Sequence, residues 1–195
     1  MPETVASLCL FIALNLPDEL RANLERPYRS LKLALAGDGV RWTPLGQIHL
    51  TLKFLGDVSA DSLAELRAAV ARGCRGVAPF SLRAQALGVF PSGPRPRVVW
   101  FGVTGGLAML RQLQDQIENE TIRWLEREAR PFQPHLTLAR IRVLGPGRAA
   151  ALRKKMAALA AADFGAWPVG RVDLMQCHLS AAGVTHTRLA EFPLG

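Results

Sequence analysis

The sequence has 195 residues, of which 49% are hydrophobic and 21% are charged, and its formal net charge is +8. This composition excludes a disordered or fibrous protein and predicts a single globular domain over residues 1–195. The excess of positive charge favours an anionic partner such as nucleic acid, although a role in solubility alone would explain it equally well.

The cysteines and the first apolar run indicate where in the cell the protein is expected. Cys9, Cys74 and Cys177 are widely spaced and form no C-x-x-C pair, so neither a zinc knuckle nor a disulfide framework is indicated. Reduced thiols are typical of a cytoplasmic protein. The apolar run over residues 8–14 is too short to span a bilayer and follows no basic residue. We therefore interpret it as a buried strand and expect no association with membranes.

Strands and helices are expected to alternate through the first part of the chain. The hydrophobic pattern and turn residues predict, in order, a strand over 7–15, a helix from 18 to about 35, a short strand over 40–43, a strand over 48–56, and a helix that starts at Ser59 and closes at Gly73 and Gly76.

Strands and helices continue to alternate in the second part. It predicts strands over 80–90 and 97–103, a long helix over 106–128 with Trp124 in its buried stripe, a strand over 135–142, a helix over 148–162, and a hairpin of strands over 169–179 and 186–192. Apart from the short strand over 40–43, the chain thus makes two similar passes, over 7–90 and from 97 onward, and each runs strand, helix, strand, helix, strand. We therefore expect an α+β fold of two lobes related by a pseudo-twofold, each an antiparallel sheet with helices packed outside.

The central strand of each pass carries the same tetrapeptide, HLTL, at residues 49–52 and 135–138. Because successive side chains of a strand point to opposite faces, the His and Thr of each copy share one face and the leucines enter the core. We expect the two strands to meet across a cleft, with His49 and His135 within about 10 Å of each other so that proton transfer can bridge them.

Two imidazoles with a pKa near neutrality can hold opposite protonation states, which suits acid and base catalysis on a phosphodiester. One histidine would take a proton from water while the other protonates the departing ribose oxygen. The hydroxyls of Thr51 and Thr137 can donate to the non-bridging phosphate oxygens. This scheme needs no metal or cofactor. A single motif of this kind is more often an ordinary amphipathic strand, but a matched second copy favours the catalytic interpretation.

Three further side chains near the motifs have both a functional and a plain interpretation. Arg130 suits phosphate geometry and Phe132 can stack on a base, or they are an exposed arginine and a core phenylalanine. Lys53 is expected on the face of His49 and Thr51, where it either adds positive potential to the cleft or is simply solvated. His178 and His186 have no repeat partner and are interpreted as structural.

The motif pair, with the longer strings RWTP at 41–44, HLTLKFLG at 49–56 and RPFQPHLTLAR at 130–140, resembles the two-histidine phosphoesterase superfamily. Within it, the chain is most similar to the RNA 2',3'-cyclic phosphodiesterases, also called 2'-5' RNA ligase-like proteins. The strings LFIAL at 10–14 and FPL at 192–194 also resemble the ends of this family. The chain departs from the pattern at Cys177 and His186, where members commonly carry a serine and an aromatic residue.

The resemblance implies an enzyme that opens a 2',3'-cyclic phosphate at an RNA end and leaves a 2'-phosphate, without a metal. It implies His49 as the proton donor to the leaving 3'-oxygen, His135 as the proton acceptor, and Thr51 and Thr137 as phosphate-binding residues. The expected partners are RNA ends or nucleotides that bear a cyclic phosphate, and the expected state is a monomer.

Two other functions stay open at this point. The same site could serve 2'-5' RNA ligation or hydrolysis of 2'-5' linkages in tRNA or oligonucleotides. Alternatively, the chain could be a basic RNA-binding module without catalysis, although two intact motifs argue against that.

Overall fold

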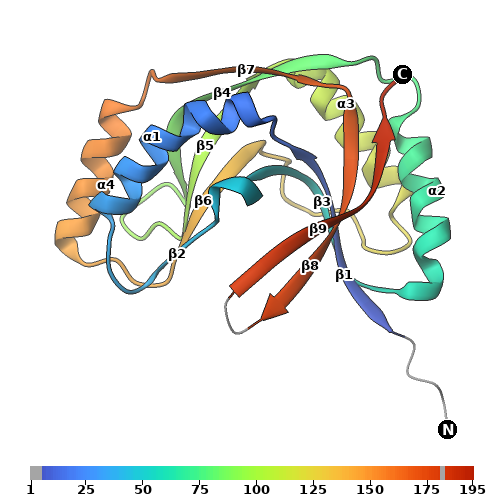
Figure 1. Cartoon of the computed structure of the whole chain (residues 1–195), viewed down its shortest axis with the longest axis horizontal. Helices are drawn as coiled ribbons and strands as arrows, with labels where there is room; N and C mark the ends of the chain where they lie inside the picture. The colour runs from blue at the N-terminus through green and yellow to red at the C-terminus, as the bar shows by residue number, and fades with distance from the viewer. Residues whose placement is uncertain (1–5, 181–182) are drawn as a thin grey trace, which may run out of the picture.

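The structure, a computed structural model, describes residues 6–180 and 183–195. Its centre is a curled, nine-stranded antiparallel sheet with the strand order β7-β4-β5-β6-β3-β1-β8-β9, and β2 pairs with β6 outside this path (Figure 1). The strands are β1 (Ser7–Asn15), β2 (Val40–Trp42), β3 (His49–Ser59), β4 (Phe80–Phe90), β5 (Val98–Gly105), β6 (His135–Ile141), β7 (Asp163–Val169), β8 (Arg171–Ser180) and β9 (Gly183–Pro193).

Four α-helices pack in two pairs at opposite ends of the sheet (Figure 1). They are α1 (Asp18–Ala34), α2 (Leu63–Cys74), α3 (Leu107–Glu120) and α4 (Pro146–Ala158). Helix α1 follows β1 but contacts β7 and α4 in the other half, and α3 follows β5 but contacts β3 and α2. Each half therefore receives one helix from the other, which ties the two halves together.

The strand order is symmetric about the pair β3 and β6. Strands β1, β8 and β9 continue the sheet beyond β3, and β5, β4 and β7 continue it beyond β6. The predicted α+β fold with two related halves is confirmed, with one difference. The halves share one continuous sheet instead of carrying separate sheets, because β3 and β6 pair directly through Leu50 and Leu136.

Both motif strands contain a register shift at the second leucine. Ile12 and Ala13 of β1 pair with Lys53 and Thr51, which leaves Leu52 as the extra residue. Val99 and Trp100 of β5 pair in the same way with Ala139 and Thr137, which leaves Leu138. An extra residue of this kind reverses the alternation of faces beyond it. The first seven residues of β3 and of β6 consequently have the same burial pattern.

The expected position of Lys53 beside His49 is therefore wrong. The shift at Leu52 turns Lys53 into the interior, where it is 5% exposed. Its Nζ lies 2.7 Å from Glu118 Oε2 of α3 and donates to the carbonyl of Leu125 at 2.8 Å. A cation beside the last turn of α3 also complements the negative end of the helix dipole.

Three further boundaries differ from the sequence prediction. Helix α3 ends at Glu120, not near residue 128, because the backbone leaves the helical conformation at Thr121 (φ −110°, ψ 11°). The next backbone bond, from the Trp124 N–H to the Thr121 carbonyl at 3.1 Å, spans only three residues, so Trp124 lies in a turn. The strand expected over 169–179 corresponds to β8, and an additional strand, β7, precedes it. Strand β7 escaped prediction because it contains Gly165 and Pro168, which weaken a strand pattern but are tolerated at the edge of a sheet.

Helix α4 spans 146–158 in place of 148–162, with Pro146 in its first turn.

Replacing Lys53 by Met is expected to lower the free energy of unfolding by about 3–5 kcal/mol, because the Glu118 carboxylate is then buried without its cation. The double variant Lys53→Met/Glu118→Leu should recover most of this loss, since an apolar pair of similar volume is often as stable as a buried ion pair. Urea unfolding of both variants measures these changes in the free energy of unfolding.

A matched control is the exposed ion pair Arg72–Glu120, which joins α2 to the end of α3. Arg72→Met should cost less than about 1 kcal/mol, as is usual for exposed pairs. A double variant no more stable than Lys53→Met alone would contradict this account of the buried pair.

Candidate active site

The two HLTL segments meet at the centre of the sheet. Leu50 and Leu136 are Cα partners in the antiparallel pair of β3 and β6, and both are fully buried in the main core. The histidines and threonines alternate with these leucines, so they lie on the opposite face, where all four are half-buried. In this register His49 is across from Thr137 and Thr51 is across from His135, which puts the histidines in diagonal positions about 7–8 Å apart in an ideal pair.

Each catalytic candidate is oriented by the same backbone contact. His49 Nδ1 lies 2.8 Å from the carbonyl oxygen of Gln47, and His135 Nδ1 lies 2.7 Å from that of Gln133. Because a carbonyl only accepts, Nδ1 carries the hydrogen in both rings and Nε2 is left free to exchange a proton. The sequence repeat is thus Q-x-H-L-T-L, two residues longer than the HLTL tetrapeptide.

The surroundings favour the neutral form of both imidazoles. Burial, and then the charges of His186 and His135, lower the pKa of His49 to about 4, against the opposing effect of the Gln47 carbonyl. Burial also lowers the pKa of His135, with a contribution from the charge of Arg140. A bound anion would act in the opposite direction and raise both pKa values, because it stabilises the imidazolium form.

Aromatic rings flank each histidine. Phe11 of β1 contacts His49 with ring centroids 4.8 Å apart. On the other side, Phe90 of β4 meets His135 edge to face at 5.0 Å, and Trp100 of β5 lies 6.4 Å from it. Trp100 lies over Gly88, where a Cβ would come within 2.1 Å of the indole ring. These rings restrict the orientation of the imidazoles and exclude water from one side of each.

His186 is a member of the site that sequence reasoning missed. It lies on β9 opposite Cys177, and its ring centroid is 5.2 Å from that of His49 and 4.8 Å from that of Phe11. Burial lowers its pKa, as does the charge of His178. No repeat partner marks His186 in the sequence, and the only signal was the departure from the family pattern at this position. His178, by contrast, is exposed and contacts Thr187.

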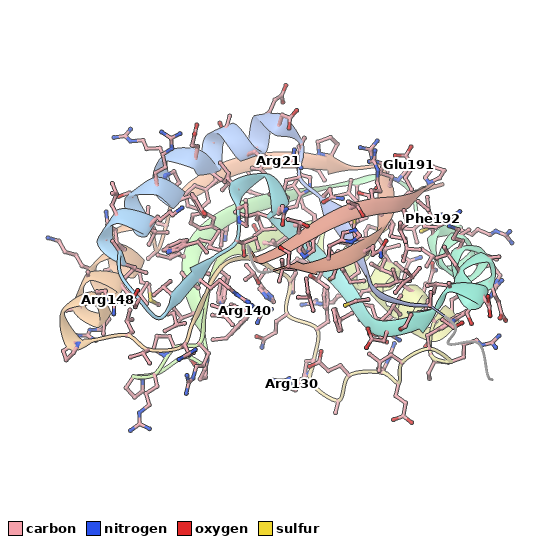
Figure 2. The ribbon with its side chains drawn as sticks, turned by 60° about the horizontal axis from the view of Figure 1, so that its bottom comes forward. Arg21, Arg130, Arg140, Arg148, Glu191 and Phe192 are labelled. Carbon is pink, nitrogen blue, oxygen red and sulfur yellow. The ribbon has the colours of Figure 1, made fainter. Side chains whose placement is uncertain are left out.

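Arg130 and Phe132 lie on the segment between α3 and β6. Arg130 is exposed and paired with Glu128, on a loop apart from Arg140 in Figure 2. Phe132 is partly buried and packs against the main core. Their contacts with RNA stay predictions, and the packing of Phe132 corresponds to its plainer interpretation.

Two general features complete the description of the site. Within the described part of the chain, no group of three or more His, Cys, Asp or Glu side chains is arranged to hold a metal ion. Every helix of residues 6–180 and 183–195 is too short or too polar to cross a membrane.

In sequence, the chain is similar to the proteins of one family. The family model described as LigT like phosphoesterase matches residues 14–100 and 105–186. A Methanothermobacter thermautotrophicus protein named RNA 2',3'-cyclic phosphodiesterase is 32% identical over 184 residues, covering 94% of this chain and 97% of the relative. An Aeropyrum pernix protein of the same name is 37% identical over 146 residues, covering 73% and 80%.

Solved structures are similar over nearly the whole chain. A crystal structure of a Thermus thermophilus protein superposes with a TM-score of 0.77 and 30% identity, covering 96% of this chain and 98% of that one. The crystal structure of E. coli LigT complexed with 3'-AMP gives a TM-score of 0.72 and 25% identity, covering 97% and 99%. The resemblance carried by the two HLTL strands is thus confirmed, and the chain belongs to the LigT-like phosphoesterase family.

Proposed function

We propose that this protein is an RNA 2',3'-cyclic phosphodiesterase that opens the cyclic phosphate at RNA ends and leaves a 2'-phosphate. One observation carries the proposal. Two Q-x-H-L-T-L strands meet in register, and each imidazole is held by the carbonyl two residues before it, with Nε2 free. The relatives from Methanothermobacter thermautotrophicus and Aeropyrum pernix, both named for this activity, support it. The E. coli LigT complex with 3'-AMP supports nucleotide binding.

The reaction needs one base and one acid. His135 Nε2 takes a proton from a water molecule, whose oxygen forms a bond to phosphorus. The bond between phosphorus and the 3'-oxygen breaks, and His49 gives its Nε2 proton to that oxygen. The products are a 2'-phosphate and a 3'-hydroxyl. Thr51 and Thr137 donate hydrogen bonds to the non-bridging oxygens, where negative charge accumulates in the transition state. No step requires a metal or a cofactor.

The donor role of His49 depends on the substrate. Its pKa of about 4 in the free protein means that the ring is neutral near pH 7. The negative charge of the bound phosphate raises this pKa, so His49 becomes a donor when the substrate is in place. His135, whose pKa is also lowered by burial, then serves as the neutral base.

The near symmetry of the site also bears on the second candidate function. Since both histidines have the same tautomer and each lies across from a threonine of the other motif, their roles can exchange when the reaction runs backwards. Joining of RNA ends through a 2'-5' linkage would use the same groups in reverse. We retain cyclic-phosphate hydrolysis as the main function, in a monomeric cytoplasmic protein as the sequence predicts.

His49→Ala and His135→Ala should each reduce kcat on adenosine 2',3'-cyclic phosphate by about 10²- to 10⁴-fold, since each removes one positioned proton-transfer group. The assay is run in EDTA, and chromatography should identify the 2'-monophosphate as the product of the unaltered protein. His178→Ala, at an exposed histidine outside the site, is the matched control and should keep its activity. Full turnover by either single variant would refute the two-histidine mechanism.

The pH dependence of kcat/KM should reflect the lowered histidine pKa values. This parameter reports the free protein, in which the donor must be protonated. Because burial lowers both pKa values below 6.5, kcat/KM should already decline as the pH rises through the range below 6.5. The corresponding decline in kcat, which reports the enzyme–substrate complex, should occur at higher pH because the bound phosphate raises the pKa of the donor. A kcat/KM that stays level up to pH 8 would be the opposite result.

Thr51→Val and Thr137→Val should each lower kcat by about 10²-fold, because each removes a donor to the transition-state phosphoryl oxygens. Thr→Ser at the same positions keeps the hydroxyl and should restore most of the rate. Steady-state kinetics with the cyclic nucleotide measures this. Equal losses in the Val and Ser variants would assign the threonines to packing and not to phosphate binding.

A further inference from the structure

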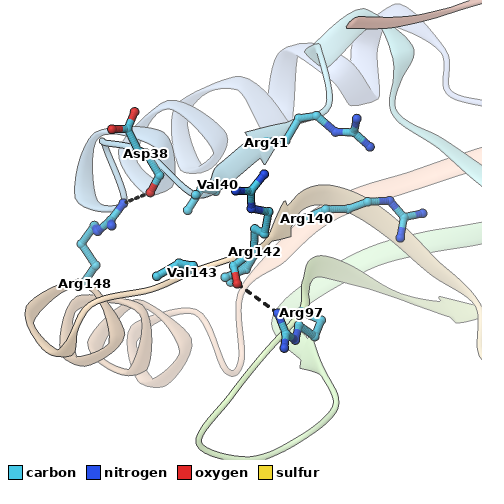
Figure 3. A pocket seen from close by; sticks show the side chains of 10 residues that line it. Asp38, Val40, Arg41, Arg97, Arg140, Arg142, Val143 and Arg148 are labelled. Carbon is cyan, nitrogen blue, oxygen red and sulfur yellow. Dashed lines mark hydrogen bonds between the residues drawn. The ribbon is translucent and has the colours of Figure 1, made fainter. Parts of the chain in front are cut away.

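Five arginines from four segments of the chain line one open cavity of about 900 Å³ beside β6, the strand of His135 (Figure 3). Arg41 comes from β2, Arg140 from β6, and Arg148 from α4. Arg97 and Arg142 lie just before β5 and just after β6. We call this cavity, defined by these five residues, the arginine groove.

The arginines of the groove lack acidic partners. Among residues 6–180 and 183–195, none of the five forms an ion pair with a carboxylate, whereas Arg72 and Arg83 on other faces do. One acidic residue, Asp38, borders the groove, and Figure 3 shows its carboxylate directed away from Arg97 and Arg140. The groove thus gathers five positive charges that the protein does not neutralise, and such a set attracts an anion with several charges.

Two of the guanidinium groups are already held in place by the backbone. Arg97 donates to the carbonyl of Arg142 at 3.0 Å, and Arg148 donates to the carbonyl of Asp38 at 2.8 Å. A guanidinium has five N–H donors, so each of these groups retains donors for a ligand. Because they are partly immobilised, they lose less side-chain entropy on binding a phosphate than free surface arginines do.

Arg140 connects the groove with the catalytic histidines. The register shift at Leu138 returns Arg140 to the exposed face that His135 and Thr137 occupy on β6. Its positive charge lowers the pKa of His135, as expected for a guanidinium near that ring. On its other side Arg140 pairs with Arg41 of β2, so the groove begins at the second motif and continues towards α4.

We propose that the arginine groove binds the phosphates of the RNA strand on the 5' side of the cyclic end, so that the preferred substrate is an oligonucleotide. This inference rests on the proposed function. A 2',3'-cyclic phosphate closes the 3' end of the chain, so every further nucleotide lies on its 5' side. Arginine matches phosphate oxygens with paired N–H donors, and contacts of this kind recognise the backbone regardless of base sequence.

The test compares two substrates in one variant. Arg97→Gln/Arg142→Gln removes two charges of the groove that lie outside the catalytic cluster. On an eight-nucleotide RNA with a 2',3'-cyclic end, kcat/KM should fall by about tenfold or more, mainly through KM. The slope of log kcat/KM against log salt should become shallower by about 0.7 for each phosphate that an arginine no longer neutralises. Turnover of adenosine 2',3'-cyclic phosphate should stay unchanged, and so should both substrates with the matched control Arg72→Gln.

Any other outcome would contradict the proposal or show that the variant damages the catalytic site. Equal losses on both substrates would show that the variant damages the catalytic site, and equal activity on both would show that the groove does not bind RNA. Binding provides a readout besides activity: fluorescence anisotropy with a labelled eight-nucleotide RNA ending in a 3'-phosphate should give a weaker Kd for the groove variant. If the unaltered protein turned over neither cyclic substrate, the proposed function would be wrong. If the groove variant bound the labelled RNA with the same Kd as the unaltered protein, the proposed role of the groove would be wrong, whatever the outcome for the function. Arg97→Lys/Arg142→Lys, which keeps the charge, should retain most of the salt dependence.

Discussion

The site depends on one short contact between two strands. Leu50 and Leu136 are the pair through which β3 joins β6, and this pair unites the two halves of the sheet. Because side chains alternate along a strand, a slip of one residue would turn the histidines and threonines into the core and the leucines outward. The full burial of both leucines makes such a slip costly, so packing of the core specifies the position of the two histidines and the two threonines.

The backbone of the site is nearly symmetric, but its surroundings are not. Both histidines donate from Nδ1 to the carbonyl two residues earlier, and both strands carry the same register shift. The differences come from the side chains around each ring: His186 of β9 lies beside His49, whereas Arg140 follows His135 on β6. Acid and base catalysis by two identical side chains requires such an asymmetry, because one must hold a proton while the other lacks it.

The sequence predicted the elements that depend on local pattern, and it failed where tertiary contacts decide. The HLTL strands, the first helix and the α+β class followed from alternation and periodicity. The register shift at Leu52 left no local mark, so the burial of Lys53 against Glu118 was not predictable. The end of α3 at Glu120 falls inside an apolar pattern that continues to Trp124, and the position of His186 beside His49 depends on strands that are distant in the sequence. The groove joins five arginines from four segments that no single motif contains.

The central claim is that two imidazoles with free Nε2 atoms hold opposite protonation states around one phosphoryl group. Nitrogen-15 NMR of the histidine rings, titrated with and without 2'-AMP, tests it most directly. We expect both His49 and His135 as Nδ1–H tautomers, with pKa values below 6.5 in the free protein that rise when the nucleotide binds. Rings in the Nε2–H tautomer, or pKa values that the nucleotide leaves unchanged, would contradict the account.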